Sequence, residues 1–282
     1  MQTPPLIYTL FGHPVSHSLS PIIHSLFAAQ FDLNMSYTTQ DTLPENFLLS
    51  LKQFRAKAGL GANVTLPLKE LAFTLCDKTS SAAGRAQAVN TLYWDESGDL
   101  WGDNTDGIGF LRDLKNKYPQ GIKNKTLLIL GAGGAAAGIL PPLLDEQPEA
   151  IYLVNRTHKR AINLAEKLSS LKLQVLSLNQ LNNNTLNLSF DIIINASSAS
   201  LENKLFPIPF SIIKKKFIYD LVYNLKLPTV FVQWAREQGA RQTHDGLGML
   251  IEQAAEAFYL WHQKRPDTQK VYLFFRQNQK GD

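Results

Sequence analysis

The chain has 282 residues, of which 44% are hydrophobic and 18% charged, a composition that excludes a disordered protein and leaves room for two domains. Its net charge of +4 is too diffuse to indicate a nucleic-acid partner, because Lys214–Lys216 is the one dense basic cluster. The single cysteine, Cys76, excludes an intramolecular disulfide framework. The sequence has neither an apolar run of roughly 18 residues nor a signal-peptide pattern. We therefore expect a cytoplasmic protein with no membrane partner.

The first hundred residues alternate short strand-like and helix-like segments. Ser20 is the expected N-cap of the first helix and Pro21 its first helical residue. The turn-forming residues 95–99 predict a hairpin between the strands on either side. The apolar periodicity predicts strands at 6–11, 36–40, 60–66, 90–94 and 100–103, and helices at 20–31, 44–57 and 68–76.

The rest of the chain reads as a regular βα alternation, which predicts an α/β fold with a parallel sheet covered on both faces. Pro141 and Pro142 fall inside an expected helix and predict a kink or an irregular turn. The Asn-rich segment Asn182–Asn187 is expected to be a loop. We expect strands at 126–130, 150–154, 173–178, 190–195 and 217–222, and helices at 106–117, 229–238, 247–262 and 267–277.

A glycine-rich turn follows the apolar run Leu127–Leu130. Gly131, Gly133 and Ala136 fill the three positions of the G-x-G-x-x-G/A pattern, with Ala132, Gly134 and Ala135 between them. The first glycine allows the tight turn, the second admits a pyrophosphate, and the alanine keeps the helix close to its strand. Because this turn follows a strand and opens a helix, it predicts a dinucleotide-binding unit that begins well inside the chain.

The end of the next strand indicates which dinucleotide binds. An NAD-specific site places an acidic residue there for the ribose 2′-hydroxyl, whereas this chain reads Asn155-Arg156-Thr157, followed by Lys159 and Arg160. A guanidinium suits a 2′-phosphate through charge-assisted hydrogen bonds. The sequence therefore favours NADP(H) over NAD.

Polar residues gather at several turns before the glycine turn. Ser18 and Ser20 lie beside the start of a helix, a place that suits a carboxylate. Asn63 and Thr65 share one face of a strand, and Lys69 follows them in the next helix. The segments Ala88–Thr91 and Gly102–Gly107 add an amide and a carboxylate at strand ends, which indicates a substrate site in the first part of the chain.

These segments resemble those of the shikimate dehydrogenase family, and the likeness covers nearly the whole chain. Its motifs stand here in order as S-x-S-P, N-V-T-x-P-x-K, A-V-N-T, D-N-T-D-G, G-A-G-G-A, N-R-T and D-G-L-G-M-L. The resemblance implies reversible NADPH-dependent reduction of 3-dehydroshikimate to shikimate, a step of aromatic amino-acid biosynthesis. It also implies that residues 1–105 and 241–282 form an α/β substrate domain, and that residues 106–240 form a Rossmann-type NADP domain with a doubly wound parallel sheet. The C-terminal helices would then return to the substrate domain.

The resemblance also assigns roles to individual residues. Lys69 and Asp106 would be the catalytic pair, as a positioned acid must protonate the oxygen once hydride reaches the carbonyl carbon. The residues leave open which of the two transfers the proton. The substrate carboxylate would contact Ser18, Ser20 and Tyr223 with Thr65 close by, and the ring hydroxyls would contact Asn90, Asp106 and Gln253. The cofactor would contact Gly131, Ala132, Gly133, Gly134, Ala135, Asn155, Arg156, Thr157, Arg160, Ser197, Leu221 and Gly246.

Two segments depart from the family pattern. The chain reads Asn195–Leu201 as N-A-S-S-A-S-L where the family has N-A-T-x-x-G-M, so Ser197 keeps a hydroxyl but the glycine is lost. Leu221 stands where the family often has methionine beside the nicotinamide. These changes bear on the geometry of the loop and on cofactor affinity.

Other functions stay open at this point. The first alternative is a quinate/shikimate dehydrogenase that uses NAD. The second is a dinucleotide-binding regulator without catalysis, and the third is another two-domain dehydrogenase that shares only the cofactor module. The retained Lys69 and Asp106 oppose the regulator, and the basic residues near Arg156 oppose NAD. The histidines show no metal-ligand spacing, so we expect no metal, and we expect a monomer or a homodimer.

Overall fold

The computed structural model describes residues 4–183 and 187–278, and it divides into two compact units. Unit 1 is built from the chain up to Gly109 together with the chain from Ile251 onward, and unit 2 is built from Phe110–Leu250. Both divisions fall inside helices, namely α5 (Asp106–Lys117) and α10 (Leu247–His262), somewhat later along the chain than the expected divisions after residues 105 and 240.

Unit 1 contains a mixed six-stranded sheet with the strand order β2-β1-β3-β5-β6-β4. The strand β1 pairs in parallel with both of its neighbours, whereas β5 is antiparallel to both β3 and β6. The β5–β6 pair is the expected hairpin. The strands are β1 (Leu6–Gly12), β2 (Met35–Asp41), β3 (Gly59–Val64), β4 (Lys78–Thr79), β5 (Thr91–Trp94) and β6 (Leu100–Asp103).

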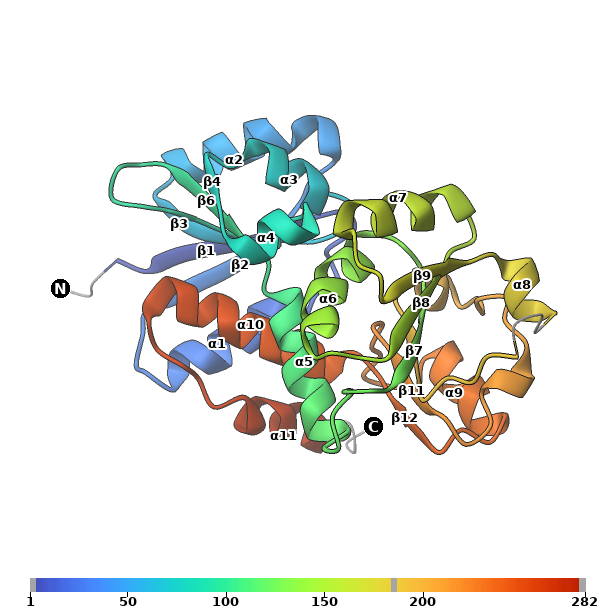
Figure 1. The fold of residues 1–282 in the computed structure, drawn as a ribbon. Helices are drawn as coiled ribbons and strands as arrows, with labels where there is room; N and C mark the ends of the chain where they lie inside the picture. Colours follow the sequence, from blue (N-terminus) through green and yellow to red (C-terminus); the bar gives the residue numbers. More distant parts are fainter. Residues whose placement is uncertain (1–3, 184–186, 279–282) are drawn as a thin grey trace. The chain divides into compact units, whose positions relative to one another are not determined.

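Helices cover both faces of this sheet (Figure 1). On one face Phe47, Leu51 and Phe54 of α2 pack with Phe11 and Val64 of the strands in a buried cluster. The other face carries α1 and the returning C-terminal helices, because Tyr8 stacks on Trp261 of α10 with ring centroids 4.4 Å apart. The helices are α1 (Ser20–Ala29), α2 (Phe47–Ala56), α3 (Lys69–Leu75), α4 (Ser81–Ala86) and α11 (Thr268–Asn278), with a 3-10 turn η1 (Pro44–Asn46).

Unit 2 contains a six-stranded sheet in which every pairing is parallel, in the order β12-β11-β10-β7-β8-β9. This is the doubly wound order of a Rossmann fold, with β7 as its first strand. The predicted α/β fold with two sheets is therefore confirmed. The strands are β7 (Thr126–Leu130), β8 (Ala150–Val154), β9 (Leu173–Leu176), β10 (Ile192–Asn195), β11 (Phe217–Asp220) and β12 (Gln242–His244).

Both faces of the parallel sheet are buried. Phe110 of α5 and Ile139 of α6 pack with Ile129 in one cluster, whereas Phe231 of α9 packs with Leu128 in the other. Strands buried on both sides read as continuous apolar runs, which explains why their positions could be predicted. The helices are α6 (Gly134–Asp145), α7 (His158–Leu168), α8 (Leu178–Asn182) and α9 (Val230–Glu237), with 3-10 turns η2 (Ala199–Glu202) and η3 (Phe210–Ile212).

The structure corrects several local expectations. Leu19, not Ser20, is the N-cap of α1, and no side chain caps that helix. The expected helix at 44–57 is a 3-10 turn followed by α2, and α6 continues through Pro141 and Pro142. Within the expected loop at 182–187, Asn182 ends α8 and residues 184–186 lie outside the described residues.

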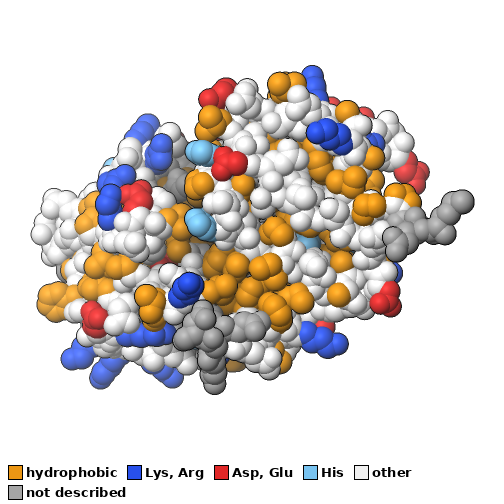
Figure 2. Space-filling model, turned by 180° about the vertical axis from the view of Figure 1, so that it is seen from behind, with side chains coloured by type: hydrophobic (Ala, Val, Ile, Leu, Met, Phe, Trp, Pro, Cys, Tyr) orange, Lys and Arg blue, Asp and Glu red, His pale blue; other side chains and the backbone are white. Residues whose placement is uncertain are grey.

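Two further findings concern the molecule as a whole. Among the described residues, no helix combines the length and the apolar character needed to cross a membrane. On the face shown in Figure 2, the Lys and Arg side chains form separate small groups among uncharged and hydrophobic surface. The basic side chains on the described part of this face are therefore dispersed, in keeping with the diffuse net charge of +4 of the chain.

Candidate active site

Lys69 and Asp106 meet at the carboxyl ends of two strands in unit 1. Lys69 is the first residue of α3, shortly after β3, and Asp106 is the first residue of α5, shortly after β6. The Nζ atom of Lys69 donates a hydrogen bond to Oδ2 of Asp106, and their side chains are 15% and 6% exposed. An ammonium has three N–H donors, so this bond leaves two for a ligand. The structure thus brings the predicted catalytic pair together.

Asn90 and Gln253 complete this cluster. The Nδ2 atom of Asn90 donates to Oδ1 of Asp106 at 2.8 Å and to Oε1 of Gln253 at 3.3 Å. The backbone N–H of Thr105 donates to Oδ1 of Asn90 at 2.8 Å, which fixes the orientation of the amide. Gln253 belongs to the part of α10 that lies in unit 1. Lys69 and Asn90 therefore bind the carboxylate of Asp106 directly, and Gln253 joins the cluster through Asn90.

The two serines and Thr65 lie beside the ends of β1 and β3. The backbone N–H of Ser20 donates to Oγ of Ser18 at 3.2 Å, so the hydroxyls belong to one turn. The backbone N–H of Thr65 donates to the carbonyl of Phe11 at 2.9 Å. A Cβ on Gly12 would lie 2.3 Å from Cγ2 of Thr65, which shows how closely the two loops approach.

Tyr223 belongs to unit 2, unlike the other predicted substrate residues. It is partly buried and follows β11. Its contact with a substrate carboxylate therefore stays a prediction.

The glycine turn has the geometry that a dinucleotide needs. Gly131 has a φ of +106°, and a Cβ there would lie 2.8 Å from the backbone nitrogen of Ser197. At Gly133, the N-cap of α6, a Cβ would meet no atom within 4 Å, so open space lies over the helix N-terminus. Ala136 is fully buried against the sheet. A pyrophosphate fits this arrangement, because helix N-termini bind anions and a side chain at Gly133 would occupy the space.

The end of β8 adds an amide and three exposed residues. Oδ1 of Asn155 accepts from the backbone N–H of Ala132 at 3.1 Å, which ties the glycine turn to the next strand. Arg156, Thr157 and Arg160 are exposed. The pKa of Glu202 is lowered, first because Lys204 donates a hydrogen bond to it and in part because Arg156 lies near. Arg156 is thus available to an anionic ligand, with one carboxylate nearby that the sequence did not indicate.

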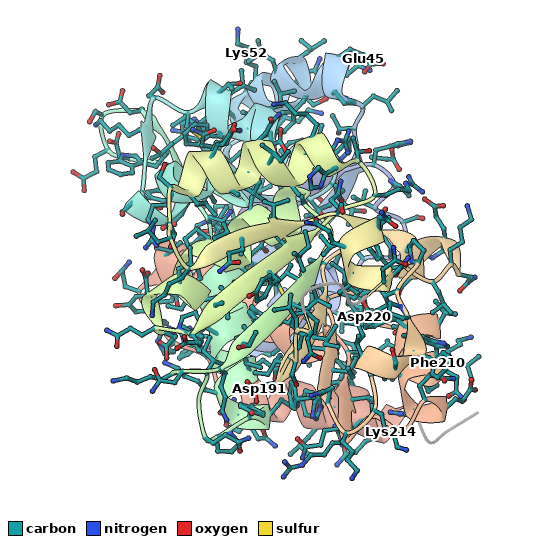
Figure 3. The ribbon with its side chains drawn as sticks, turned by 45° about the vertical axis from the view of Figure 1, so that its right-hand side comes forward. Glu45, Lys52, Asp191, Phe210, Lys214 and Asp220 are labelled. Carbon is teal, nitrogen blue, oxygen red and sulfur yellow. The ribbon has the colours of Figure 1, made fainter. Side chains whose placement is uncertain are left out.

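The segment that departs from the family pattern is held by hydrogen bonds. Oδ1 of Asn195 accepts from Oγ of Ser197 at 2.6 Å, and Nδ2 of Asn195 donates to Asp220 at 3.0 Å. Ser200 and Thr229 donate to the other carboxylate oxygen of Asp220 at 2.8 and 2.6 Å. Asp220, labelled in Figure 3, is fully buried, and burial raises its pKa to about 6. Ser200 thus supplies a contact for this loop that the sequence did not predict.

Leu221 and Gly246 lie next to each other in unit 2. A Cβ on Gly246 would lie 2.0 Å from the carbonyl oxygen of Leu221, so only glycine permits this approach. The backbone N–H of Leu221 donates to the carbonyl of Asn195 at 2.9 Å. The predicted cofactor residues that follow β7, β10 and β11 therefore lie at the carboxyl edge of one parallel sheet, where nucleotides bind in such folds.

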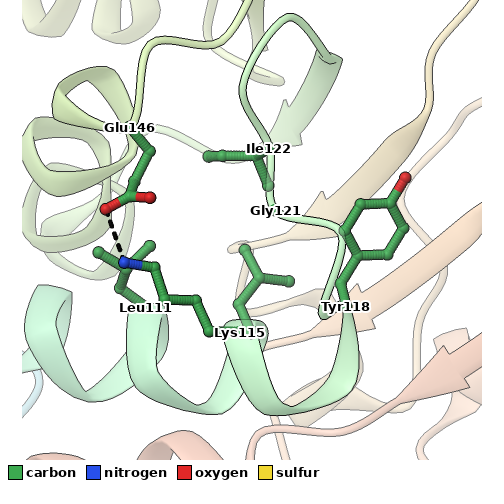
Figure 4. Close-up of a pocket in the computed structure, with 7 residues that line it drawn as sticks. Leu111, Lys115, Tyr118, Gly121, Ile122 and Glu146 are labelled. Carbon is green, nitrogen blue, oxygen red and sulfur yellow. Dashed lines mark hydrogen bonds and ion pairs between the residues drawn. The ribbon is translucent and has the colours of Figure 1, made fainter.

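A small pocket elsewhere in unit 2 is not part of this site. It is lined by α5, the end of α6 and the loop before β7, and an ion pair of 2.8 Å joins Lys115 to Glu146 across it (Figure 4). None of the predicted site residues lines it. Among residues 4–183 and 187–278, no group of three or more His, Cys, Asp or Glu side chains could hold a metal ion.

Models of known protein families match most of the chain. Residues 10–92 match the shikimate dehydrogenase substrate binding domain, residues 113–205 match shikimate / quinate 5-dehydrogenase, and residues 246–272 match the shikimate 5′-dehydrogenase C-terminal domain. Shikimate dehydrogenase (NADP(+)) of Aeromonas hydrophila is 47% identical over 272 residues, which is 96% of this chain and 97% of that protein.

Solved structures agree with this match. Shikimate dehydrogenase of Aquifex aeolicus has a TM-score of 0.86 at 32% identity and covers 100% of both chains. Shikimate 5-dehydrogenase of Thermus thermophilus, in complex with NADP(H) and shikimate, has a TM-score of 0.84 at 36% identity, over 96% of this chain and 99% of that one. The chain belongs to the shikimate dehydrogenase family.

Proposed function

We propose that the protein catalyses the reversible NADPH-dependent reduction of 3-dehydroshikimate to shikimate, in the biosynthesis of chorismate and aromatic amino acids. The observation that carries this proposal is the Lys69–Asp106 ion pair in unit 1, to which the amide of Asn90 donates while it also binds Gln253. Family membership supplies the reaction, and the ion pair supplies the acid–base group that the reaction needs.

NADPH, when bound, would supply the hydride, and the side chains of the protein supply the proton and hold the substrate. As the carbonyl oxygen of the substrate gains negative charge, the Lys69 ammonium stabilises that charge and donates a proton to it. The carboxylate of Asp106 holds the ammonium in place and accepts a hydrogen bond from a neighbouring ring hydroxyl. In the oxidative direction the neutral amine of Lys69 takes up the hydroxyl proton, and the Asp106 carboxylate holds the ammonium that results.

The remaining substrate residues bind and orient the ring. The hydroxyls of Ser18, Ser20 and Tyr223 contact the carboxylate, with Thr65 close by. Asn90 and Gln253 hold ring hydroxyls, because an amide both donates and accepts hydrogen bonds. Apart from Tyr223, the residues with these roles belong to unit 1.

Unit 2 is the proposed NADP domain. The turn from Gly131 through Ala135 receives the pyrophosphate, and Arg156, with Arg160, pairs with the 2′-phosphate. Asn155 and Thr157 hold the adenosine side, while Ser197, Leu221 and Gly246 lie on the nicotinamide side. Residues 1–105 with 241–282 and residues 106–240 remain our proposed domain limits. We also propose that the protein is cytoplasmic and is a monomer or a homodimer.

The test is the appearance of reduced cofactor in purified protein, followed by absorbance at the nicotinamide band. Shikimate and quinate are each assayed with NADP and with NAD. Shikimate with NADP is expected to give the highest kcat/KM. Quinate with NAD as the best pair would reject the proposal in favour of the quinate-using alternative, and no activity with any pair would reject an enzyme.

A further inference from the structure

Tyr37 of β2 donates into a buried chain of hydrogen bonds in unit 1. Its hydroxyl donates to Oδ1 of Asn63 at 2.8 Å. The ring is held by His24, which stacks on it with centroids 4.3 Å apart and planes 7° apart. Burial raises the pKa of the Tyr37 hydroxyl, so it remains a donor throughout the neutral range.

The chain continues from Asn63 to the catalytic carboxylate. Nδ2 of Asn63 donates to Oγ1 of Thr91 at 3.1 Å, and the Thr91 hydroxyl donates to Oδ1 of Asn90 at 2.9 Å. Nδ2 of Asn90 then donates to Oδ1 of Asp106 at 2.8 Å. Asn63, Thr91, Asn90 and Asp106 are all buried.

Main-chain partners fix the direction of both amides. Nδ2 of Asn63 also donates to the backbone carbonyl of Asn90 at 3.1 Å, so its oxygen faces Tyr37. Oδ1 of Asn90 accepts from the backbone N–H of Thr105, so its nitrogen faces Asp106. Every donor in the chain therefore points toward the carboxylate of Asp106. Hydrogen bonds arranged head to tail polarise one another, which strengthens the last bond in the series.

We infer that Tyr37 is a positioning residue for the catalytic pair, acting through Asn63, Thr91 and Asn90. This inference rests on the proposed function, since it deepens the roles of Lys69 and Asp106. The Tyr37 hydroxyl sets the orientation of the Asn63 amide, and the polarised chain holds the Asp106 carboxylate toward Lys69. Loss of the hydroxyl leaves a buried acceptor on Asn63 without its donor, which loosens the series.

The test compares Tyr37→Phe with Tyr8→Phe. Tyr8 lies opposite Tyr37 in the β1–β2 register and is 3% exposed, and its hydroxyl makes no hydrogen bond to another described residue. Tyr37→Phe is expected to lower kcat for shikimate oxidation about tenfold, with the KM for NADP unchanged. Tyr8→Phe is expected to keep the wild-type kcat. Equal kcat in wild type and Tyr37→Phe would overturn the inference, as would a parallel rise in the KM for NADP.

A double-mutant cycle provides a second measurement that a general loss of stability would not mimic. Thr91→Val removes a later hydroxyl of the same chain while keeping the shape of the side chain. Because both variants break one series, the fold-loss in kcat of the double variant is expected to stay within about twofold of the larger single loss, well below the product of the two single fold-losses. Fully additive losses would overturn the inference. If wild-type protein gives no reduced NADP with shikimate, the proposed function has failed instead.

Discussion

The two carboxylate oxygens of Asp106 have different partners: Oδ2 accepts a hydrogen bond from the ammonium of Lys69, whereas Oδ1 accepts one from the amide of Asn90. This division fixes the plane of the carboxylate and directs Lys69 to one side of it. A carboxylate held from both sides can orient an acid without itself moving.

Lys69→Ala is expected to lower kcat by roughly 10²–10⁴-fold, the scale of a positioned acid or base. NADP binding is expected to persist, because Lys69 lies in unit 1 and the cofactor residues lie in unit 2. Steady-state kinetics and cofactor titration measure the two effects. Lys52→Ala is the matched control, since Lys52 is an exposed lysine of α2 (Figure 3). Turnover at the wild-type rate in Lys69→Ala would remove that residue from the mechanism.

Arg156→Ala is expected to weaken NADP binding by roughly 10–100-fold, the loss of a charge-assisted hydrogen bond to phosphate, and to change NAD binding little. Kd values for both cofactors from fluorescence titration give the comparison. Lys167→Ala, at an exposed position in the last turn of α7, the helix that follows Arg156, serves as the control for net charge. Equal losses for the two cofactors would contradict a role in 2′-phosphate binding.

Gly131→Ala and Gly133→Ala are expected to fail in different ways. Alanine at Gly131 meets the backbone of Ser197 and adopts a left-handed φ, so we expect a loss of stability of about 1–3 kcal/mol. Alanine at Gly133 meets no protein atom within 4 Å, so its Tm is expected to stay unchanged while the Kd for NADP rises. Thermal unfolding and cofactor titration separate the two. Unchanged NADP affinity in Gly133→Ala would argue against a pyrophosphate at the turn.

His24 is expected to make the fold sensitive to acid. Burial, with a smaller effect of His262, lowers its pKa to about 3. The imidazole of His24 therefore binds a proton more tightly in the unfolded chain than in the folded protein. The free energy of unfolding is highest above pH 6.5, where the imidazole is neutral in both states, and it decreases as the pH falls from 6.5 toward 3. At pH 5 the loss amounts to roughly 2 kcal/mol.

His24→Phe keeps an aromatic ring beside Tyr37 but carries no titrating group. Urea unfolding followed by tryptophan fluorescence at pH 7 and pH 5 is expected to show a smaller pH dependence in this variant than in wild type. His17→Gln, at an exposed position, is the control and is expected to behave as wild type. The same pH dependence in all three proteins would show that His24 is not the group responsible.

The regular parts of the fold could be predicted because local signals agreed with burial. The helices at 106–117 and 247–262 and the strands at 126–130 and 150–154 match the structure, since each is a clear periodic or apolar run. The helix α4 was missed because its sequence, S-A-A-G-R-A, is short and has no apolar period. Strand β12 was missed because Gln242–His244 is polar and pairs only at a sheet edge.

The candidate site shows the same limit. Motifs indicated Lys69 and Asp106, which follow strands, and Asn90, which precedes one, and the structure brings the three together in unit 1. Asp220 and Tyr37 were not singled out, since they have partners in other segments, such as Asn195 for Asp220 and Asn63 for Tyr37. Long-range hydrogen bonds of this kind depend on the strand order, which the local sequence does not reveal.

The most direct test of the central claim is the identity of the product. Purified protein is incubated with NADPH and 3-dehydroshikimate, and the mixture is followed by NMR. We predict that shikimate forms in equal amount to the NADPH consumed. Bound NADPH with no shikimate formed would contradict the claim.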